Sequence, residues 1–193
     1  GTATAMGKNV VREFREARLL MGLFPQELNF DVFFTIRQLL ILQAGYYGLN
    51  KKRATERTDL ILQKFGLTEK AHNTARELSG GMKRRVQIAK ALVHDPPIII
   101  LDEPTAGVDI ELRHMLWNYL RELNREGKTI LLTTHYIEEA EALCDRVAII
   151  DQGKIATEGS PRELISKLGT GSIEIKLHDI PSELNIEPWE FSR

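Results

Sequence analysis

The feature that most constrains the fold of this chain is a run of large aliphatic residues that ends in two acids. Residues 98–101 read Ile-Ile-Ile-Leu and are followed by Asp102, Glu103 and Pro104. Four consecutive aliphatic side chains are typical of a strand buried in a parallel sheet, and the proline stops its extension. Ligands of open α/β sheets gather at the carboxyl ends of the strands, so we expect both carboxylates at a binding site.

A second feature lies upstream, where small residues open a helix. Ser79, Gly80 and Gly81 precede a stretch with apolar residues at helical spacing. The first N–H groups of a helix have no partner within it, and the helix dipole is positive at this end. Because no bulky side chain stands in the way, we expect this helix start to bind an anion such as a phosphate group.

The two acids of the strand have separate expected roles. Mg²⁺ prefers a few carboxylate oxygens together with phosphate oxygens and water, which suits Asp102. Glu103 projects in a different direction and could accept a proton from an attacking water, a role worth about 10²–10⁴-fold in rate. The alternative is that both residues are exposed acids of a turn.

Strand and helix patterns alternate from residue 95 onward, which predicts a parallel sheet. We expect strands at 98–101, 129–133 and 147–150 and helices at 111–125 and 137–143. A hairpin turn at 151–154 then leads into a closing strand. His135 follows the second strand, so it is expected at the same sheet edge as Asp102 and Glu103. A lone histidine is otherwise most often a satisfied surface or core residue.

The first half of the chain reads differently. Residues 1–26 contain short strand patterns and an amphipathic piece, whereas helical patterns cover 33–49, 56–65 and the stretch from about Gly81. We interpret Asn50 and Gly66 as helix-end signals. Lys83 and its neighbours Arg84 and Arg85 lie in a first helical turn, where cations oppose the dipole. They favour an anion or an acidic neighbour close by; the alternative is a solvated basic turn.

These motifs, taken in order, resemble the ATP-binding subunits of ABC-type transporters. Residues 78–82 resemble the signature motif, and residues 98–103 resemble the Walker B strand with its catalytic glutamate. The Q-loop, the D-loop and the switch histidine are matched by residues 25–26, 106–109 and 133–135. The resemblance covers residues 1–168 and is greatest to the bacterial drug and polysaccharide export class. It implies an α/β fold, with a P-loop NTPase-like ABC ATPase core and a helical subdomain.

The resemblance also implies the ligands and the site residues. ATP and Mg²⁺ are the expected cofactors, held between two copies of the domain that pair head to tail. The implied catalytic residues are Glu103, His135 and Gln26; the implied nucleotide-binding residues are Ser79, Gly80, Gly81 and Asp109; the implied metal-binding residues are Asp102 and Gln26. Met82 stands where many members of the family carry glutamine, and the D-loop departs from its common form, which suits the exporter branch.

The family pattern also requires a P-loop of the form G-x-x-x-x-G-K-[ST] upstream of the Q-loop, and this sequence contains none. Residues 1–9 offer only a decoy, because Asn9 stands in place of the magnesium-binding Ser or Thr. We interpret residues 7–10 as a structural turn. The expectation is an ABC ATPase polypeptide that lacks its N-terminal P-loop portion and is inactive alone.

Four segments follow from this interpretation. We expect the remnant of an antiparallel β subdomain with the Q-loop at 1–26 and a helical subdomain with the signature motif at 27–93. A catalytic core with Walker B, D-loop and switch histidine is expected at 94–168. Residues 169–193, with an alternating pattern at 172–177, are expected to begin a C-terminal accessory segment. Ser160 and Glu163 have the spacing of a capping box before the last helix of the core.

The net charge and composition of the chain limit which partners and locations are expected. A net charge of −1 argues against a general nucleic-acid binder, and the single cysteine excludes an intrachain disulfide and suits a reducing compartment. No run of about 18 apolar residues is present, so direct membrane insertion is not expected. The expected setting is the cytoplasmic face of the inner membrane, reached through a permease subunit. The alternatives are a soluble ABC-type ATPase that acts on ribosomes or DNA, and a catalytically silent module.

Overall fold

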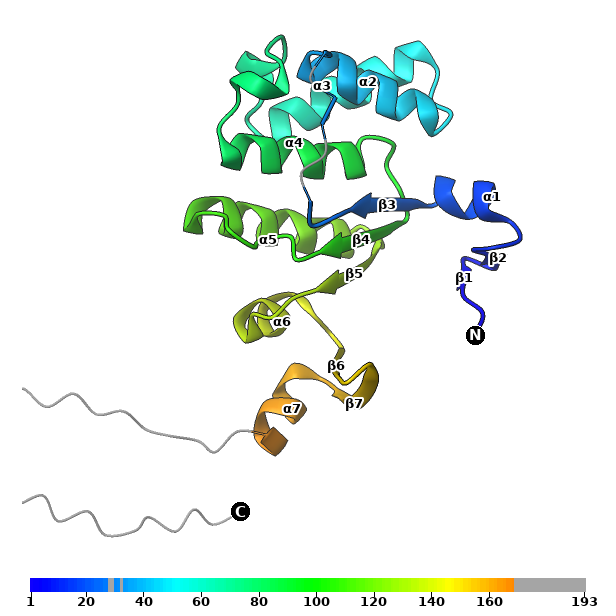
Figure 1. The fold of residues 1–193 in the computed structure, drawn as a ribbon, viewed down its shortest axis with the longest axis vertical. Helices are drawn as coiled ribbons and strands as arrows, with labels where there is room; N and C mark the ends of the chain where they lie inside the picture. Colours follow the sequence, from blue (N-terminus) through cyan, green and yellow to red (C-terminus); the bar gives the residue numbers. More distant parts are fainter. Residues whose placement is uncertain (28–29, 32, 169–193) are drawn as a thin grey trace, which may run out of the picture.

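A three-stranded parallel sheet organises the chain, and two of its strands are those expected from the sequence (Figure 1). The computed structural model describes residues 1–27, 30–31 and 33–168. The sheet has the order β3-β4-β5, with β3 at Met21–Phe24, β4 at Ile98–Asp102 and β5 at Thr129–Thr133. All three strands run in the same direction, so their carboxyl ends lie side by side.

The interpretation of residues 1–26 as an antiparallel subdomain is only partly right. Strands β1 (Thr4–Ala5) and β2 (Lys8–Asn9) do form an antiparallel hairpin. Its turn lies at Met6 and Gly7, which have φ angles of 48° and 81°, and not at 7–10 as expected. After helix α1 (Phe14–Leu19), however, β3 pairs with β4 in the parallel sheet. The apolar run before the Q-loop is therefore a strand of the core.

Gly22 explains how β3 reaches this position. A Cβ atom added to Gly22 would lie 2.1 Å from the carbonyl oxygen of Ala91 and 2.7 Å from Cγ of Pro96. The C-terminal part of α4 (Gly80–Leu92) thus packs directly on the backbone of β3. Only glycine permits so close an approach between helix and strand.

We predict that Gly22→Ala lowers the free energy of unfolding by about 1–3 kcal/mol or more, because the new methyl group meets backbone atoms that cannot move aside. Urea unfolding followed by circular dichroism measures this. Gly45→Ala is the matched control, since a Cβ added to this helical glycine has no atom within 4 Å. It should be neutral or stabilising, and equal losses for both variants would contradict the packing argument.

Three longer helices form the helical region, with boundaries that differ from the predicted ones. They are α2 (Ile36–Tyr46), α3 (Lys51–Lys64) and α4. Helix α2 begins later than expected because Thr35 and Gln38 form a capping box. Asn50 was expected to end a helix, but its side chain accepts a hydrogen bond from the Arg53 N–H and starts α3. Short 3-10 turns at Thr68–Lys70 and Ala75–Glu77 connect α3 to α4.

The second half alternates as expected up to α6 and then departs. Helices α5 (Ile110–Arg125) and α6 (Ile137–Leu143) flank β5 in sequence. Strand β6 (Val147–Asp151) was expected in the parallel sheet, but among the described residues it pairs only with β7 (Lys154–Gly159), antiparallel, through the predicted hairpin. Helix α7 (Pro161–Leu168) has the predicted capping box of Ser160 and Glu163. The expected accessory segment at 169–193 lies outside the described residues.

Within the part of the chain that the structure describes, helices cover one face of the sheet only. Phe24, Ile99 and Leu101 are fully buried in a core shared with the helices. On the opposite face Leu23 and Leu131 are 58% and 60% exposed, and Ile100 between them is only partly buried. A strand buried on both faces was expected for residues 98–101, and this expectation holds for one face. Among the helices of the described residues, none is long and apolar enough to cross a membrane.

A buried histidine joins the helical region to the sheet. His94, 9% exposed, stacks on Tyr47 with ring centroids 3.5 Å apart, and its Nε2 lies 3.2 Å from the carbonyl oxygen of Met21. Burial lowers the pKa of His94 from 6.5 to about 4. The ring is therefore neutral in the folded protein at neutral pH.

Acid should therefore weaken the fold through His94. Below pH 6.5 His94 becomes protonated in the unfolded chain, whereas in the folded chain it stays neutral down to about pH 4. Stability falls across this window, by about 3 kcal/mol in total. His94→Phe keeps a ring against Tyr47 and removes the titration, so the difference in unfolding free energy between wild type and variant should change between pH 7 and pH 4. A difference that is independent of pH would contradict the assignment.

Candidate functional site

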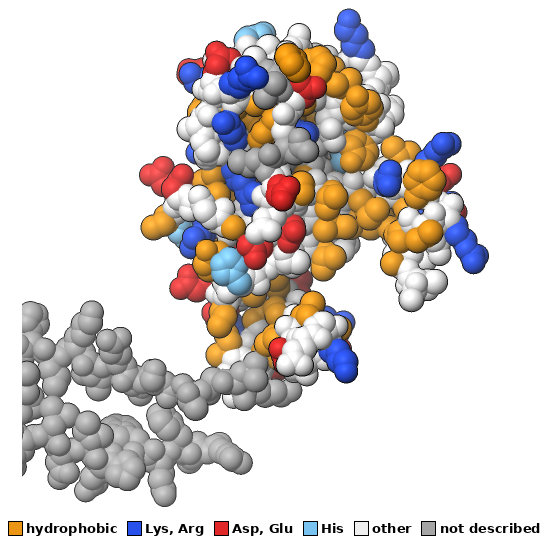
Figure 2. All heavy atoms as spheres, viewed as in Figure 1, with side chains coloured by type: hydrophobic (Ala, Val, Ile, Leu, Met, Phe, Trp, Pro, Cys, Tyr) orange, Lys and Arg blue, Asp and Glu red, His pale blue; other side chains and the backbone are white. Residues whose placement is uncertain are grey.

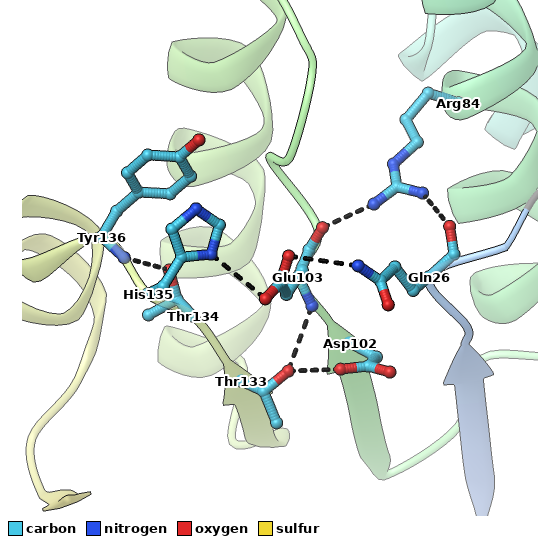
Figure 3. Close-up of polar contacts among 8 residues, drawn as sticks. All are labelled: Gln26, Arg84, Asp102, Glu103, Thr133, Thr134, His135 and Tyr136. Carbon is cyan, nitrogen blue, oxygen red and sulfur yellow. Dashed lines mark hydrogen bonds and ion pairs between the residues drawn. The ribbon is translucent and has the colours of Figure 1, made fainter.

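The carboxyl ends of the three parallel strands bring together a carboxylate, an amide and an imidazole (Figure 3). Glu103 follows β4, Gln26 follows β3 and His135 follows β5. Nδ1 of His135 lies 3.1 Å from Oε1 of Glu103, and Nε2 of Gln26 donates to Oε2 of Glu103 over 3.3 Å. Both oxygens of one carboxylate are thus held by neighbours from the two flanking strands.

Acidic and histidine side chains are visible near the middle of the face shown in Figure 2, over these strand ends. The Glu103 side chain is 28% exposed and the His135 side chain 56% exposed. A carboxylate accepts hydrogen bonds, so Nδ1 of His135 is the donor in this contact. Nε2, the other ring nitrogen, takes no part in it.

The backbone of Glu103 is strained. Its φ angle is +46°, in the left-handed region that non-glycine residues rarely adopt. Such a residue costs about 1–3 kcal/mol and persists only where its surroundings hold it. Here the Glu103 N–H donates to the carbonyl oxygen and the hydroxyl of Thr133, each over 3.2 Å, and the Glu103 carbonyl accepts from Arg84.

Asp102 lies beside this group and faces a different neighbour. The hydroxyl of Thr133 donates to its Oδ1, so Thr133 links both acids of the pair. Asp102 is exposed at the end of β4, in line with the prediction that the acids project differently. The alternative of two exposed turn acids holds for the exposure of Asp102, whereas Glu103 is only partly exposed and both acids have side-chain or backbone hydrogen bonds.

Arg84 holds the loops of the site together, and the sequence analysis missed this role. Its guanidinium donates to the carbonyl oxygens of Gln26 over 2.8 Å and Pro104 over 3.4 Å, as well as to that of Glu103. It also lies over the ring of Phe24 at 4.3 Å. The side chain is 6% exposed. Burial lowers the pKa of Arg84, while the charges of Glu103 and Asp102 act in the opposite direction.

Gln87, one turn further along α4, also binds backbone carbonyl oxygens of the Q-loop. Its amide nitrogen donates to the carbonyl oxygens of Pro25, over 2.8 Å, and of Glu27. The cluster of Lys83, Arg84 and Arg85 favoured an anion or an acidic neighbour, and the charges of Glu103 and Asp102 do act on Arg84. The hydrogen-bond partners of Arg84 are backbone carbonyl oxygens, which sequence patterns do not mark.

The remaining predicted residues form a second group. Ser79 is exposed, not interior, and caps α4 by accepting from the Met82 N–H over 3.3 Å. Asp109 caps α5 by accepting from the Leu112 N–H over 2.7 Å. A Cβ atom added to Gly81 would lie 3.8 Å from Oδ2 of Asp109, so the start of α4 adjoins the D-loop of the same chain.

The two groups are not joined directly. Within residues 1–27, 30–31 and 33–168, no hydrogen bond links Ser79, Gly80, Gly81 or Asp109 to Glu103 or His135. Each group instead presents exposed polar atoms: backbone N–H groups at the helix start and side chains at the strand ends. This arrangement is compatible with two half-sites on one chain.

In the described part of the chain, no group of three or more His, Cys, Asp or Glu side chains is placed so that it could hold a metal ion by itself. Mg²⁺ bound with a nucleotide needs less, since one or two carboxylates and the phosphates suffice. Asp102 is an exposed carboxylate of this kind, and the hydroxyl of Thr133 donates to its Oδ1.

Acid, amide and imidazole groups that converge at the carboxyl ends of parallel strands are typical of α/β proteins that bind nucleotides. The family model described as ABC transporter matches residues 1–106, which is more than half of the 193 residues. The chain therefore belongs to the ABC transporter family.

Two relatives are similar to the chain over all or most of its length. The chain is 43% identical, over 194 aligned positions, to the Nod factor export ATP-binding protein I of Burkholderia orbicola, and all of it aligns with 64% of that protein. It is 46% identical over 176 positions to the protein of the same name from Burkholderia pseudomallei, where 91% of the chain aligns with 58% of the relative. The chain thus spans less than two thirds of the length of these relatives.

Solved structures share the fold. An ATP-binding subunit of an ABC transporter superposes with a TM-score of 0.76 at 28% identity, over 84% of this chain and 68% of that one. A dimeric ATP-binding cassette in a post-hydrolysis state with ADP and Pi gives a TM-score of 0.76 at 25% identity, over 84% and 74%. The fold of the chain is that of ABC ATPase subunits, as the sequence predicted.

We predict that Arg84→Met lowers the free energy of unfolding by about 3 kcal/mol, because three carbonyl oxygens, buried or partly buried, lose a charged donor. Hydrogen exchange at the amides of Gln26 and Glu27 should become faster. Lys83→Met, on the same turn of α4, should change stability by no more than about 0.5 kcal/mol. If both variants behaved alike, the hydrogen bonds of Arg84 would not be what holds these loops.

Proposed function

We propose that this chain is part of the ATP-binding and ATP-hydrolysing subunit of an ABC exporter. The observation that carries the proposal is the placement of Glu103, with one carboxylate oxygen on His135 and the other on Gln26. A carboxylate fixed in this way at a sheet edge is suited to orient and polarise a water molecule.

Each residue has a role in the proposed reaction. Glu103 polarises the attacking water, and His135 contacts the γ-phosphate and holds the glutamate in line. Gln26 touches both the water and the metal, and Asp102 holds Mg²⁺ through water. The bound Mg²⁺ would neutralise charge on the phosphates. Catalysis of this kind depends on positioning and on charge stabilisation around a loose transition state.

The second group is proposed to act on the nucleotide of another subunit. Ser79, Gly80 and Gly81 would close over ATP bound to a second copy of the domain, with Asp109 linking the two sites. Exposure of Ser79 and the contact of Gly81 with Asp109 support this, because the anion-binding helix start and the D-loop then lie on one surface. The dimeric form of the ADP-bound cassette is a precedent in a related fold.

The cradle for the α- and β-phosphates is proposed to come from a strand and P-loop outside residues 1–193. Two observations support this. The free edge of β5 borders a groove of about 540 Å³, lined by Ile130, Leu131 and Leu132 and by the connection from α6 to β6. The uncovered sheet face at Leu23 and Leu131 needs an apolar cover. One strand followed by a helix would fill both places.

Export is favoured over the soluble alternative. The relatives are named export ATP-binding proteins, and another structural neighbour, at 28% identity, is part of an ABC transporter complex of Clostridium perfringens. The net charge of −1 gives no support to a role on ribosomes or DNA. We therefore propose a membrane permease as partner and a peripheral location at the cytoplasmic face of the inner membrane.

The residue roles can be tested in a P-loop fusion, defined as residues 1–193 joined to an upstream strand, P-loop and helix of an ABC ATPase. We expect Glu103→Gln and His135→Ala to lower kcat for ATP hydrolysis by about 10²–10⁴-fold, because each removes a group that acts on the reacting phosphate or water. Phosphate release measures the rate. His72→Ala, at an exposed histidine of the helical region, should leave it unchanged. Full activity of Glu103→Gln would refute the assignment.

Residues 1–193 alone should bind ATP weakly and hydrolyse it negligibly, because nothing in this stretch can cradle the α- and β-phosphates. Calorimetric titration with Mg-ATP and a phosphate-release assay check both expectations, with the P-loop fusion as positive control. Robust turnover by the chain alone would overturn the requirement for a P-loop.

A further inference from the structure

Helix α6 follows His135 directly, so whatever anchors α6 also sets the position of this histidine. The helix spans only Ile137–Leu143, and its N-cap residue Tyr136 makes no side-chain cap hydrogen bond. So short a helix is not stable by itself in water. Its position must come from contacts with the rest of the protein.

Three side chains on one face of α5 contact α6 or its N-cap residue, and α7 also packs against α6. Arg113, Trp117 and Arg121 are each four residues apart, so they share a face of that helix. We call these three residues the α5 stripe. The guanidinium of Arg113 lies 5.2 Å from the centre of the Tyr136 ring, before the first turn of α6. Nε of Arg121 donates to the carbonyl oxygen of Ala142 over 3.2 Å, near the other end of α6.

The middle contact is the most unusual. Glu139 is completely buried, and its Oε1 accepts a hydrogen bond from the indole Nε1 of Trp117 over 2.9 Å. Its Oε2 is buried without a hydrogen-bond partner in the part of the chain that the structure describes. Burying a carboxylate with one oxygen unpartnered costs free energy. An apolar residue would serve packing better, so the group is not explained by packing alone.

The anchored helix is in contact with the switch histidine. The rings of Tyr136 and His135 lie 4.1 Å apart, and His135 reaches Glu103 through Nδ1. At the start of α5, the side chain of the N-cap residue Asp109 caps the helix, and its carbonyl accepts from the Arg113 N–H. One rigid helix therefore carries the D-loop at its start and holds α6 along its side.

We propose that Glu139, bound to Trp117 of the α5 stripe, is a positioning residue that holds His135 against Glu103 and ties its position to that of Asp109. The inference rests on the proposed function for the role of His135 in hydrolysis. The geometric part does not depend on that role, because it concerns only whether the Glu139–Trp117 hydrogen bond maintains the contact of His135 with Glu103.

The geometric part is tested on residues 1–193 by NMR of the histidine side chains. The ¹⁵N shifts of an imidazole report which ring nitrogen carries the proton, and the contact with Glu103 favours the proton on Nδ1 of His135. We expect Glu139→Ala and Trp117→Phe to shift His135 towards the tautomer mixture of a solvated histidine. Glu139→Gln retains an acceptor for the indole and should preserve the wild-type signature.

Two controls separate positioning from a general loss of structure. Glu138→Ala alters the exposed neighbour of Glu139 on α6 and should leave the signal of His135 unchanged. The imidazole ¹⁵N shifts of His94, a buried histidine outside α6, should stay the same in every folded variant. If Glu139→Ala does not fold, Trp117→Phe carries the test. Unchanged His135 signals in folded Trp117→Phe and Glu139→Ala would overturn the proposal.

Hydrolysis by the P-loop fusion then connects position to rate. We expect Trp117→Phe to lower kcat by roughly 10- to 100-fold, with little change in KM for ATP, since the displaced group acts on the reacting phosphate. Glu139→Gln should restore most of the rate. If His135→Ala were fully active while the NMR shifts occurred, the proposed function of His135 would fail and the positioning contact would stand.

Discussion

The hydrogen bonds of one buried guanidinium determine much of this structure. Arg84 donates to carbonyl oxygens of the loops that follow β3 and β4, and it packs on Phe24 beneath them. Its acceptors are neutral, so the interaction depends on geometry more than on charge pairing. A lysine cannot reach several acceptors at fixed angles in this way, which makes arginine difficult to replace here. These bonds connect α4 to the loops that follow β3 and β4.

The sequence predicted the strands that carry Asp102, Glu103 and His135 better than it predicted how the strands pair. The pattern of four aliphatics followed by Asp102 and Glu103 located β4 and its acids, and the strand before His135 was correct to the residue. Both signals are local, since they depend on hydrophobic periodicity and on where a strand ends. Strand partners are not local. Strands β3 and β6 were misassigned because their pairing depends on Gly22 and on the availability of a neighbouring edge, neither of which an apolar run encodes.

Helix boundaries and hydrogen bonds to the backbone were also difficult to predict, because they too depend on more than the local sequence pattern. Asn50 was a helix signal in the sequence, but its direction was ambiguous because asparagine occurs at both ends of helices. The sequence did not indicate the structural roles of Arg84 and Gln87, since each donates to backbone carbonyl oxygens, which every residue type possesses. A motif therefore identifies the side chains that face a ligand more readily than those that hold the loops from behind.

The left-handed backbone at Glu103 has a consequence for how its carboxylate acts. Since the main chain is fixed on both sides of the residue, the direction of the side chain is set when the protein folds and not when a ligand arrives. A charged group that is already oriented needs little reorganisation as charge develops beside it. The conformational strain at this one residue is thus the cost of preorganisation, met in advance by the stability of the sheet that carries it.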